Sequence, residues 1–422
     1  MTADRPVGAV AAVDQPDTHL CLVAPEALPN LLPALSPASA PGQVILLWAP
    51  PLAAAATRLA ACLQRRGIAC TRWEIADTGD PAAIQRQLAR HLATLPGAAP
   101  AGAPPRIALN ASGGSRAMAI AATALFRAHD LPIFCVAPAA DRLVWLHPAA
   151  RPVQSLDASL ALTEVLAAQG LVPGGSDPAG MAAVPPPRQQ LCAWLAEQNR
   201  RLAPALTELD RLATHAPAPV DAQPQSAADA RMRALTALIQ RLALAGVVRI
   251  DRGRVRYADR AARAFVQGGW IAEHCLALLQ ERSVPAALMR VEALAREDGP
   301  GHPADLLCLA RNRLHLMVCL RPRQDRHRPR QDQNGSRRDQ DRPRQDQHRP
   351  SPSAATGIQP ELLQQVLAGS DARVLLLGLL EPPPAVRRRA AELGIQVCAG
   401  SRLAALPATL RTWIDGTDQG LG

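Results

Sequence analysis

The chain has 422 residues, of which 48% are hydrophobic and 2% aromatic, and it carries a formal net charge of +10. This length exceeds what one hydrophobic core usually organises, so two or three domains are expected. The scarcity of aromatic rings argues against recognition of nucleic acid by many stacked bases, and the absence of lysine excludes any reaction that needs a lysine amine, because all 46 basic residues are arginine.

Nine cysteines are scattered through the chain without a CxxC pair, and most lie in apolar runs. This pattern predicts buried, reduced thiols and a cytoplasmic protein. The ten histidines form no HExxH or HxH pair, so no zinc site is expected. The N-terminus is acidic where a signal peptide needs basic residues, and no apolar run reaches about 18 residues, so neither a signal peptide nor a membrane span is expected.

Residues 17–150, which follow a loose tail over 1–16, alternate between short apolar runs and segments with helical spacing. This alternation predicts a three-layer α/β domain. The expected strands are 19–24, 43–48, 68–75, 107–109, 133–136 and 143–146, and the expected helices are 52–66, 80–95 and 116–129. Asp80 followed by Pro81 is typical of a helix start.

The stretch from Arg106 to Val136 combines a buried strand, a glycine turn, a helix and a second strand. Gly113 and Gly114 allow the backbone to approach a ligand, and the unpaired N–H groups and dipole of the helix start favour an anion there. Arg116 adds a positive charge in the first turn. An equally good interpretation is that the glycines only shorten a turn and Ser115 only caps a helix, because the stretch is neither a GxGxxG nor a Walker A loop.

The helix of this stretch is expected to bury one apolar face. Five residues are available for that face: Met118, Ile120, Ala121, Leu125 and Phe126. Because ligands of such sheets bind beyond the carboxyl ends of the strands, the functional site is expected where Pro25-Glu26 and Ser112 to Gly114 follow their strands.

The composition after residue 150 changes to Pro, Gly, Ser and Ala, which predicts a linker over 151–188. Residues 189–265 contain helical segments followed by a hairpin, an order typical of a winged helix-turn-helix. Four arginines of the hairpin could contact phosphates or form an ordinary solvated face: Arg249, Arg252, Arg254 and Arg256.

Residues 266–422 predict a third domain, again of the α/β class. A helix over 271–282 carries Glu273, and extended segments follow at 287–294, 304–310 and 314–320, the last two joined by a tight turn at Arg311-Asn312-Arg313. Further elements are expected after the insert: helix 360–367, strand 373–379, helix 384–393, strand 395–398 and helix 403–414.

The insert 321–356 contains RPRQD three times and is too polar to form a core, so it is expected to be disordered. Between Arg321 and Pro350 there are ten Arg and five Asp, a net charge of 10 − 5 = +5, half of the excess of the whole chain. Such a tract attracts nucleic acid weakly, but its repetition is more typical of a slippage expansion.

Four segments carry a resemblance to known motifs. LNASGGSRAMAIAATALF resembles N-x-T-G-G-T-K-x-M, with Ser112 and Ser115 at the threonines and Arg116 at the lysine, and APEALPNLLP resembles a loop that follows a first strand. GGWIAEH resembles G-G-W-L-E-E and includes Glu273. ADLLCLARNRLHLMVCL resembles the paired strands E-L-D-V-L…N-N-R-L-x-x-I-E-C-K and includes Asp305.

In this order the segments resemble the CRISPR ancillary nuclease family of type III CRISPR systems, which joins a CARF domain to a PD-(D/E)XK nuclease-like domain. The resemblance implies a Rossmann-like CARF domain, a winged-helix-like middle and a restriction-endonuclease-like C-terminal domain. It also implies a homodimer that binds a cyclic oligoadenylate, cyclic tetra-adenylate above all. The ligand-binding residues it implies are Glu26, Asn110, Ser112, Gly113, Gly114, Ser115 and Arg116.

The nuclease motif departs from the family at two positions. The family needs acidic side chains for Mg²⁺ or Mn²⁺ and a lysine, and the resemblance offers Asp305 and Glu273 as catalytic residues, with Asp305 as the metal ligand. The expected Glu and Lys of the second strand are Val318 and Leu320 here. Glu297 or Asp298 could substitute for the missing acid.

Three hypotheses about function follow from the sequence. The first is a cyclic-oligoadenylate-binding effector of CRISPR antiviral defence whose nuclease domain is weak or inactive. The second is an active metal-dependent nuclease of DNA or RNA that the ligand switches on. The third is a ligand-responsive DNA-binding regulator that acts through the winged-helix-like middle.

Overall fold

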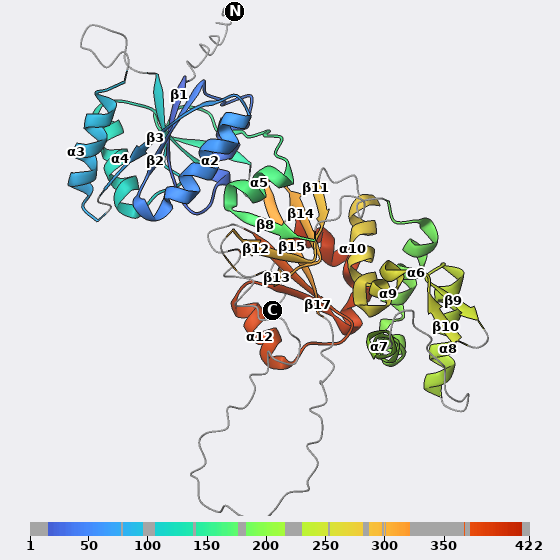
Figure 1. Cartoon of the computed structure of the whole chain (residues 1–422). Helices are drawn as coiled ribbons and strands as arrows, with labels where there is room; N and C mark the ends of the chain where they lie inside the picture. The colour runs from blue at the N-terminus through green and yellow to red at the C-terminus, as the bar shows by residue number, and fades with distance from the viewer. Residues whose placement is uncertain are drawn as a thin grey trace, which may run out of the picture.

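The computed structural model describes most of the chain, with gaps at the N-terminus, in several loops and around the predicted insert (Figure 1). The residues described are 16–76, 79–95, 106–137, 141–175, 183–215, 230–251, 254–281, 287–297, 299, 301–320, 367 and 372–415. The insert 321–356 and nearly all of the helix expected over 360–367 lie outside these residues, as does the tail over 1–15.

The N-terminal domain is built on a seven-stranded sheet with the order β3-β2-β1-β4-β5-β6-β7. Its strands are β1 (Thr18–Leu22), β2 (Gln43–Trp48), β3 (Ala69–Glu74), β4 (Ile107–Asn110), β5 (Ile133–Ala137), β6 (Arg142–His147) and β7 (Gln154–Ser155). The first five strands are parallel, and β6 and β7 are antiparallel additions at one edge. The six strands expected from the sequence are all present, and the three-layer α/β class is confirmed.

Helices cover both faces of this sheet, as Figure 1 shows. The helices are α1 (Leu28–Leu35), α2 (Ala53–Arg65), α3 (Pro81–Leu92), α4 (Arg116–Ala128) and α5 (Leu162–Gln169), with a short 3-10 turn, η1 (Pro50–Leu52), before α2. Apolar residues of α1 and α2 pack on one face of the sheet, and those of α3 and α4 pack on the other. The predicted cap of α3 is confirmed, because the Asp80 carboxylate accepts a hydrogen bond from the Ala82 N–H at 2.9 Å.

The expectation that Ile120 lies on the buried face of α4 is wrong. Its side chain is 62% exposed, whereas Met118 and Ala121 are buried. Successive helical residues are separated by about 100° around the axis, so Ile120 lies roughly 200° from Met118, on the opposite side of the helix. The consequence is an apolar side chain in solvent, one turn after Arg116.

The expected linker over 151–188 is also wrong for its central part. It contains α5 and then β8 (Leu171–Gly174), and the spacing of the buried residues Leu162, Val165 and Leu166 is that of a helix face. Strand β8 pairs with β12 of the C-terminal part in a three-stranded sheet, β13-β12-β8. A composition rich in Ala and Gly hid a segment that joins the two halves of the molecule.

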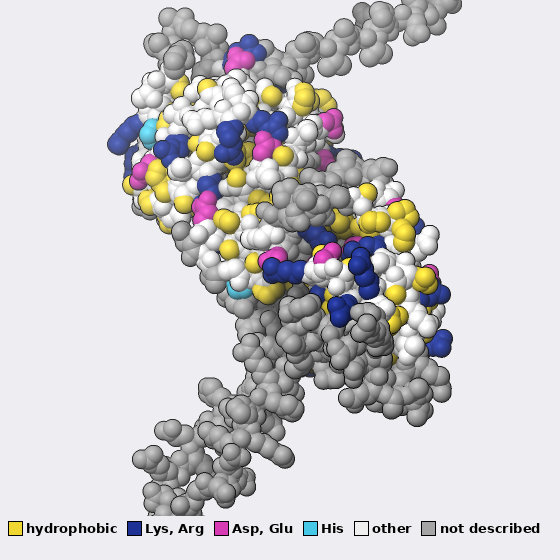
Figure 2. All heavy atoms as spheres, turned by 45° about the vertical axis from the view of Figure 1, so that its right-hand side comes forward, with side chains coloured by type: hydrophobic (Ala, Val, Ile, Leu, Met, Phe, Trp, Pro, Cys, Tyr) yellow, Lys and Arg dark blue, Asp and Glu magenta, His cyan; other side chains and the backbone are white. Residues whose placement is uncertain are grey.

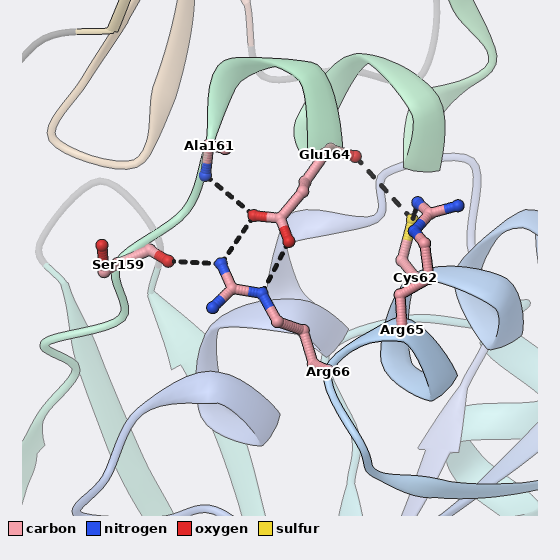
Figure 3. A network of polar contacts seen from close by, with 6 residues as sticks. All are labelled: Cys62, Arg65, Arg66, Ser159, Ala161 and Glu164. Atoms are coloured by element: carbon pink, nitrogen blue, oxygen red, sulfur yellow. Dashed lines mark hydrogen bonds and ion pairs between the residues drawn. The ribbon is translucent and has the colours of Figure 1, made fainter.

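Charged contacts hold α5 against α2 (Figure 3). The Arg66 guanidinium donates to both carboxylate oxygens of Glu164, at 2.6 and 2.7 Å, and to the carbonyl oxygen of Ser159 at 2.9 Å. The same carboxylate accepts a hydrogen bond from the Ala161 N–H at 2.9 Å, which caps the helix. Hydrogen bonding from Arg66 lowers the pKa of Glu164, so the carboxylate is charged at neutral pH.

The middle of the chain consists of helices followed by a hairpin, as predicted. The helices are α6 (Pro186–Glu197), α7 (Asn199–His215), α8 (Ala230–Leu244) and α9 (Arg260–Ala264), and the hairpin is β9 (Val248–Asp251) with β10 (Arg254–Tyr257). The two strands pair antiparallel. Apolar residues of α6, α7 and α8 belong to the same core as the C-terminal sheet, so this part packs on that sheet.

The C-terminal domain has a five-stranded sheet with the order β11-β14-β15-β16-β17. Its strands are β11 (Ala287–Arg290), β14 (Leu306–Ala310), β15 (Arg313–Leu320), β16 (Arg373–Gly378) and β17 (Gln396–Ala399), and the smaller sheet adds β12 (Ala293–Arg296) and β13 (His302–Pro303). The helical elements are η4 (Phe265–Gly269), α10 (Trp270–Glu281), α12 (Pro384–Glu392), η6 (Gly400–Ala405) and α13 (Leu406–Asp415). Arg311 and Asn312 both have positive φ, which confirms the tight turn between β14 and β15.

The predicted burial of the cysteines holds for seven of the nine, and all nine are free thiols. In the part of the chain that the structure describes, no helix is both long and apolar enough to cross a membrane.

Three buried histidines should make the protein sensitive to acid. Burial lowers the pKa of His19 to about 3 and the pKa values of His274 and His315 to about 4. The unfolded chain binds these protons near pH 6.5, so between pH 6.5 and about 4 it carries more protons than the folded chain, and stability falls as the pH falls. Each histidine contributes about 1.4 kcal/mol per pH unit in this window.

Urea unfolding at several pH values between 7 and 5 measures this slope. Replacing His274 with Leu should flatten the slope by roughly a third, since one of the three groups is removed. An unchanged slope in this variant would contradict the assignment.

Candidate functional site

The candidate site lies where β1 and β4 end side by side at the centre of the N-terminal sheet. The strand order runs outward in opposite directions from this pair, and the helices that follow, α1 and α4, pack on opposite faces. Such a switch point leaves a crevice beyond the carboxyl ends of the two strands. The loops that border it are 23–27 and 111–115.

The glycine turn is pressed against the end of β1. A Cβ atom on Gly113 would lie 2.2 Å from the carbonyl oxygen of Leu22, closer than any side chain permits. Gly114 has a φ of +76°, a conformation that favours glycine, and a Cβ there would lie 3.0 Å from the Leu22 Cβ. Both glycines are therefore required by close packing of the two loops.

Asn110 lies underneath this turn and is fully buried. Its Nδ2 donates to the Pro29 carbonyl oxygen at 2.8 Å and to the Asn30 Oδ1 at 3.0 Å, and its Oδ1 accepts from the Ser112 N–H at 3.2 Å and the Ser112 hydroxyl at 2.6 Å. Asn30 in turn donates to the Leu22 carbonyl oxygen at 3.0 Å. Asn110 thus ties both loops together.

Asn110 and Ser112, which the sequence predicts as ligand contacts, are hydrogen-bonded within the protein. Ser112 Oγ accepts a hydrogen bond from the Val136 N–H at 2.7 Å while it donates to Asn110. A buried polar group must find an internal partner, and these bonds supply one. The two residues hold the loop that borders the crevice, and their contact with a ligand stays a prediction.

The start of α4 offers groups that suit an anion. Ser115 Oγ accepts a hydrogen bond from the Met118 N–H at 3.1 Å, so it caps the helix as predicted. The backbone N–H groups of Arg116 and Ala117 belong to the first turn, where no intrahelical partner exists. The Arg116 side chain is exposed beside them. Helix dipole, N–H groups and guanidinium all favour negative charge at this point.

Glu26, the other predicted ligand contact, is directed at α5. Its Oε1 accepts hydrogen bonds from the Leu28 N–H at 3.1 Å and from Gln169 Nε2 at 2.9 Å. Gln169 is the last residue of α5. The sequence held no signal for this contact, because Gln169 lies in the segment interpreted as a linker.

Val318 and Leu320 lie two residues apart on β15 and share one face of the C-terminal sheet, and Asp305 precedes β14, whose first residue, Leu306, pairs with Met317. Helix α10, which carries Glu273, packs on the opposite face, because its apolar residues share a core with Met317 and Cys319. Val318 is 0% exposed and Leu320 is 7% exposed, both within an apolar cluster. The Asp305 carboxylate accepts a hydrogen bond from the Cys319 N–H at 2.7 Å.

Glu273, the predicted acid of the nuclease helix, forms an ion pair. Its Oε2 lies 2.7 Å from an NH2 nitrogen of Arg188 on α6, and its residue is only 6% exposed. Burial raises the pKa of Glu273, and the positive charges of Arg188 and Arg290 oppose that rise. Arg188 also lies over the Phe265 ring, 4.6 Å from its centroid. This carboxylate holds α6 against α10.

The donor set does not fit a metal ion. Two of the four family positions are apolar, Glu273 is paired with an arginine, and Glu297, the possible substitute, lies 3.0 Å from an NH1 nitrogen of Arg58. Among the described residues no group of three or more His, Cys, Asp or Glu could hold a metal. Asp298 lies outside the described residues.

Arginines are dispersed on the face that Figure 2 shows, in separate groups among apolar side chains on both halves of the molecule. In the hairpin, Arg249 and Arg256 are exposed and occupy opposite positions in the register of the two strands. Arg252 lies outside the described residues. DNA binding by this hairpin stays a prediction.

Among known proteins, this chain is similar to solved structures. No protein-family model and no curated protein sequence matches this chain. Protein VC1899 from Vibrio cholerae superposes with a TM-score of 0.74 and 20% identity, covering 96% of this chain and 99% of that one. Can2 from Sulfobacillus thermosulfidooxidans, in complex with cyclic tetra-adenylate, has a TM-score of 0.68 and 20% identity, covering 94% and 97%. The chain shares their fold.

Replacing Gly113 with Ala should destabilise the protein by about 1–3 kcal/mol, because the added methyl group forces the turn away from β1. Gly42→Ala is the matched control, since its Cβ would lie 3.7 Å from the nearest atom, Asp17 O, at an ordinary contact distance. Urea unfolding of both variants measures the difference. Equal stability of the two would show that the turn is not tightly packed.

Proposed function

We propose that this chain is a cyclic-oligoadenylate-responsive effector of type III CRISPR defence, and that cyclic tetra-adenylate binds at the crevice beyond β1 and β4. One observation carries the proposal: a glycine turn, held against β1, leads into a capped helix whose first N–H groups and Arg116 favour phosphate. A protein of the same fold over nearly its whole length has a solved structure in complex with cyclic tetra-adenylate, which supports this choice of ligand.

The proposed active form is a homodimer. A ring of four identical nucleotides has two-fold symmetry, which suits two copies of one crevice related by a two-fold axis. Each copy would then contribute one helix start and one Arg116 to the ring.

The proposed state of the C-terminal domain is an inactive nuclease. The support is chemical: the positions expected to hold a glutamate and a lysine carry Val318 and Leu320, buried among apolar side chains. Glu273 is engaged with Arg188. Ligand binding would change the arrangement of this domain or its partners without cleavage of nucleic acid.

Arg116→Ala should weaken binding of cyclic tetra-adenylate about 10- to 150-fold, because a charge-assisted hydrogen bond contributes about 1.5–3 kcal/mol. Isothermal titration calorimetry of the full chain measures this. Arg127→Ala is the matched control, since Arg127 is exposed at the opposite end of the same helix. Equal affinities for the two variants would remove Arg116 from the site.

Incubation with Mg²⁺ or Mn²⁺, cyclic tetra-adenylate and labelled single-stranded DNA or RNA should give no cleavage above a metal-free control. The physical reason is the lack of a set of acidic ligands beside Asp305. Metal-dependent cleavage that disappears in Asp305→Ala would contradict the proposal and identify an active nuclease.

A further inference from the structure

A small cavity lies on the N-terminal domain, away from the proposed nucleotide crevice. His19, which lines it, is the second residue of β1, whereas the crevice lies beyond the last residue of that strand. The other polar side chains that line it most closely come from β6 and the chain that follows: Trp145, Arg151 and Gln154. The cavity leaves about 10 Å³ for the centre of a water molecule.

Four residues that line this cavity each have a buried polar atom without a hydrogen-bond partner among the residues that the structure describes. These atoms are His19 Nδ1, Trp145 Nε1, Arg151 NH1 and Gln154 Oε1. Leaving even one buried polar group unsatisfied is costly, and native proteins satisfy most such groups with protein or ordered water. Four at one small cavity therefore point to a bound polar molecule.

The hydrogen-bonding capacities of these atoms match one water molecule. Trp145 Nε1 and Arg151 NH1 can only donate, and Gln154 Oε1 can only accept. Burial lowers the pKa of His19 to about 3, so its ring is neutral, and Nδ1 accepts when the proton is on Nε2. A water accepts two hydrogen bonds and donates two, so one molecule has the capacity to satisfy all four atoms. A site of this volume with two to four polar partners holds one water.

We propose that this cavity is a binding site for one buried water molecule, which joins the start of β1 to the edge of the sheet through His19, Trp145, Arg151 and Gln154. An anion fits less well, because the Gln154 oxygen and the Nδ1 lone pair of His19 would face its charge. A cation is excluded by the two N–H donors.

The water adds to contacts that are otherwise sparse at this edge. Strand β7 has only two residues and pairs with β6 at two positions. The Arg151 guanidinium lies over the Trp145 ring, 4.5 Å from its centroid, which brings the loop between β6 and β7 back to the sheet. The bound molecule extends this attachment to β1.

The first test compares two variants of the full chain by thermal unfolding. Gln154→Leu removes the acceptor and should lower the melting temperature by about 2–4 °C, because the water and its remaining partners lose a hydrogen bond. Gln396→Leu is the matched control: Gln396 Oε1 is also buried without a partner but does not line the cavity, so removing it should leave the melting temperature unchanged or higher. An unchanged or higher melting temperature in Gln154→Leu would mean an empty cavity and overturn the proposal.

The second test is a crystal structure of the full chain, with a matched crystal soaked in sodium bromide. A density peak within hydrogen-bond distance of at least three of the four atoms, without anomalous signal after the soak, supports a water. An anomalous peak in the cavity would identify an anion site, and absence of density would identify an empty one; either result overturns the proposal.

Discussion

The close contact between the glycine turn and the end of β1 determines the shape of the proposed ligand site. A Cβ atom at position 113 would collide with the Leu22 carbonyl oxygen. Glycine, which has no Cβ, therefore allows the 111–115 loop to lie closer to β1 than any other residue at this position would. Asn110 then fastens the arrangement from below, through hydrogen bonds to both loops. The position of the α4 start, and with it the direction of its N–H groups, follows from these contacts. The position of the proposed anion site at the surface therefore depends on buried contacts beneath it.

The two ends of the molecule show opposite uses of buried polar groups. At the 111–115 loop of the N-terminal domain, the Asn110 amide and the Ser112 hydroxyl are hydrogen-bonded within the protein and define the loop geometry. In the C-terminal domain, positions where the resemblance expects charged side chains are apolar and belong to the core. Burying Val318 and Leu320 contributes on the order of 1.5–3 kcal/mol for each fully buried side chain, whereas a catalytic carboxylate or ammonium there would have to be kept solvated or paired. Apolar side chains at these two positions and a closed core therefore go together.

Much of the fold could be predicted from the sequence, because strands such as Gln43–Trp48 and helices such as Ala230–Leu244 have strong periodicity and clear ends. The helix cap at Ser115 and the glycine turn were also predictable from residue type. The sequence pointed to Asn110 and Ser112 but not to the hydrogen bonds that hold them, because their partners Pro29, Asn30 and Val136 lie far away in the chain. The prediction of a buried side chain was wrong for Ile120, because this apolar residue faces solvent. The prediction of a linker was wrong for α5, because an Ala-rich composition concealed a helix. Partners distant in sequence, such as Arg188 for Glu273, leave no local pattern.

The segment formed by α5 and β8 has a mechanical consequence. Gln169, which holds the Glu26 carboxylate beside the crevice, is separated from β8 by a single residue, Gly170. Strand β8 is hydrogen-bonded along its length to β12, and Val291, just before β12, donates its N–H to the Asp305 carbonyl oxygen at 3.2 Å. The 23–27 loop is thus connected to the C-terminal part of the molecule through a few covalent and hydrogen bonds. A rotation of one half of the molecule relative to the other must therefore distort the segment formed by α5 and β8 or break its pairing with β12. The two halves are mechanically coupled through this segment.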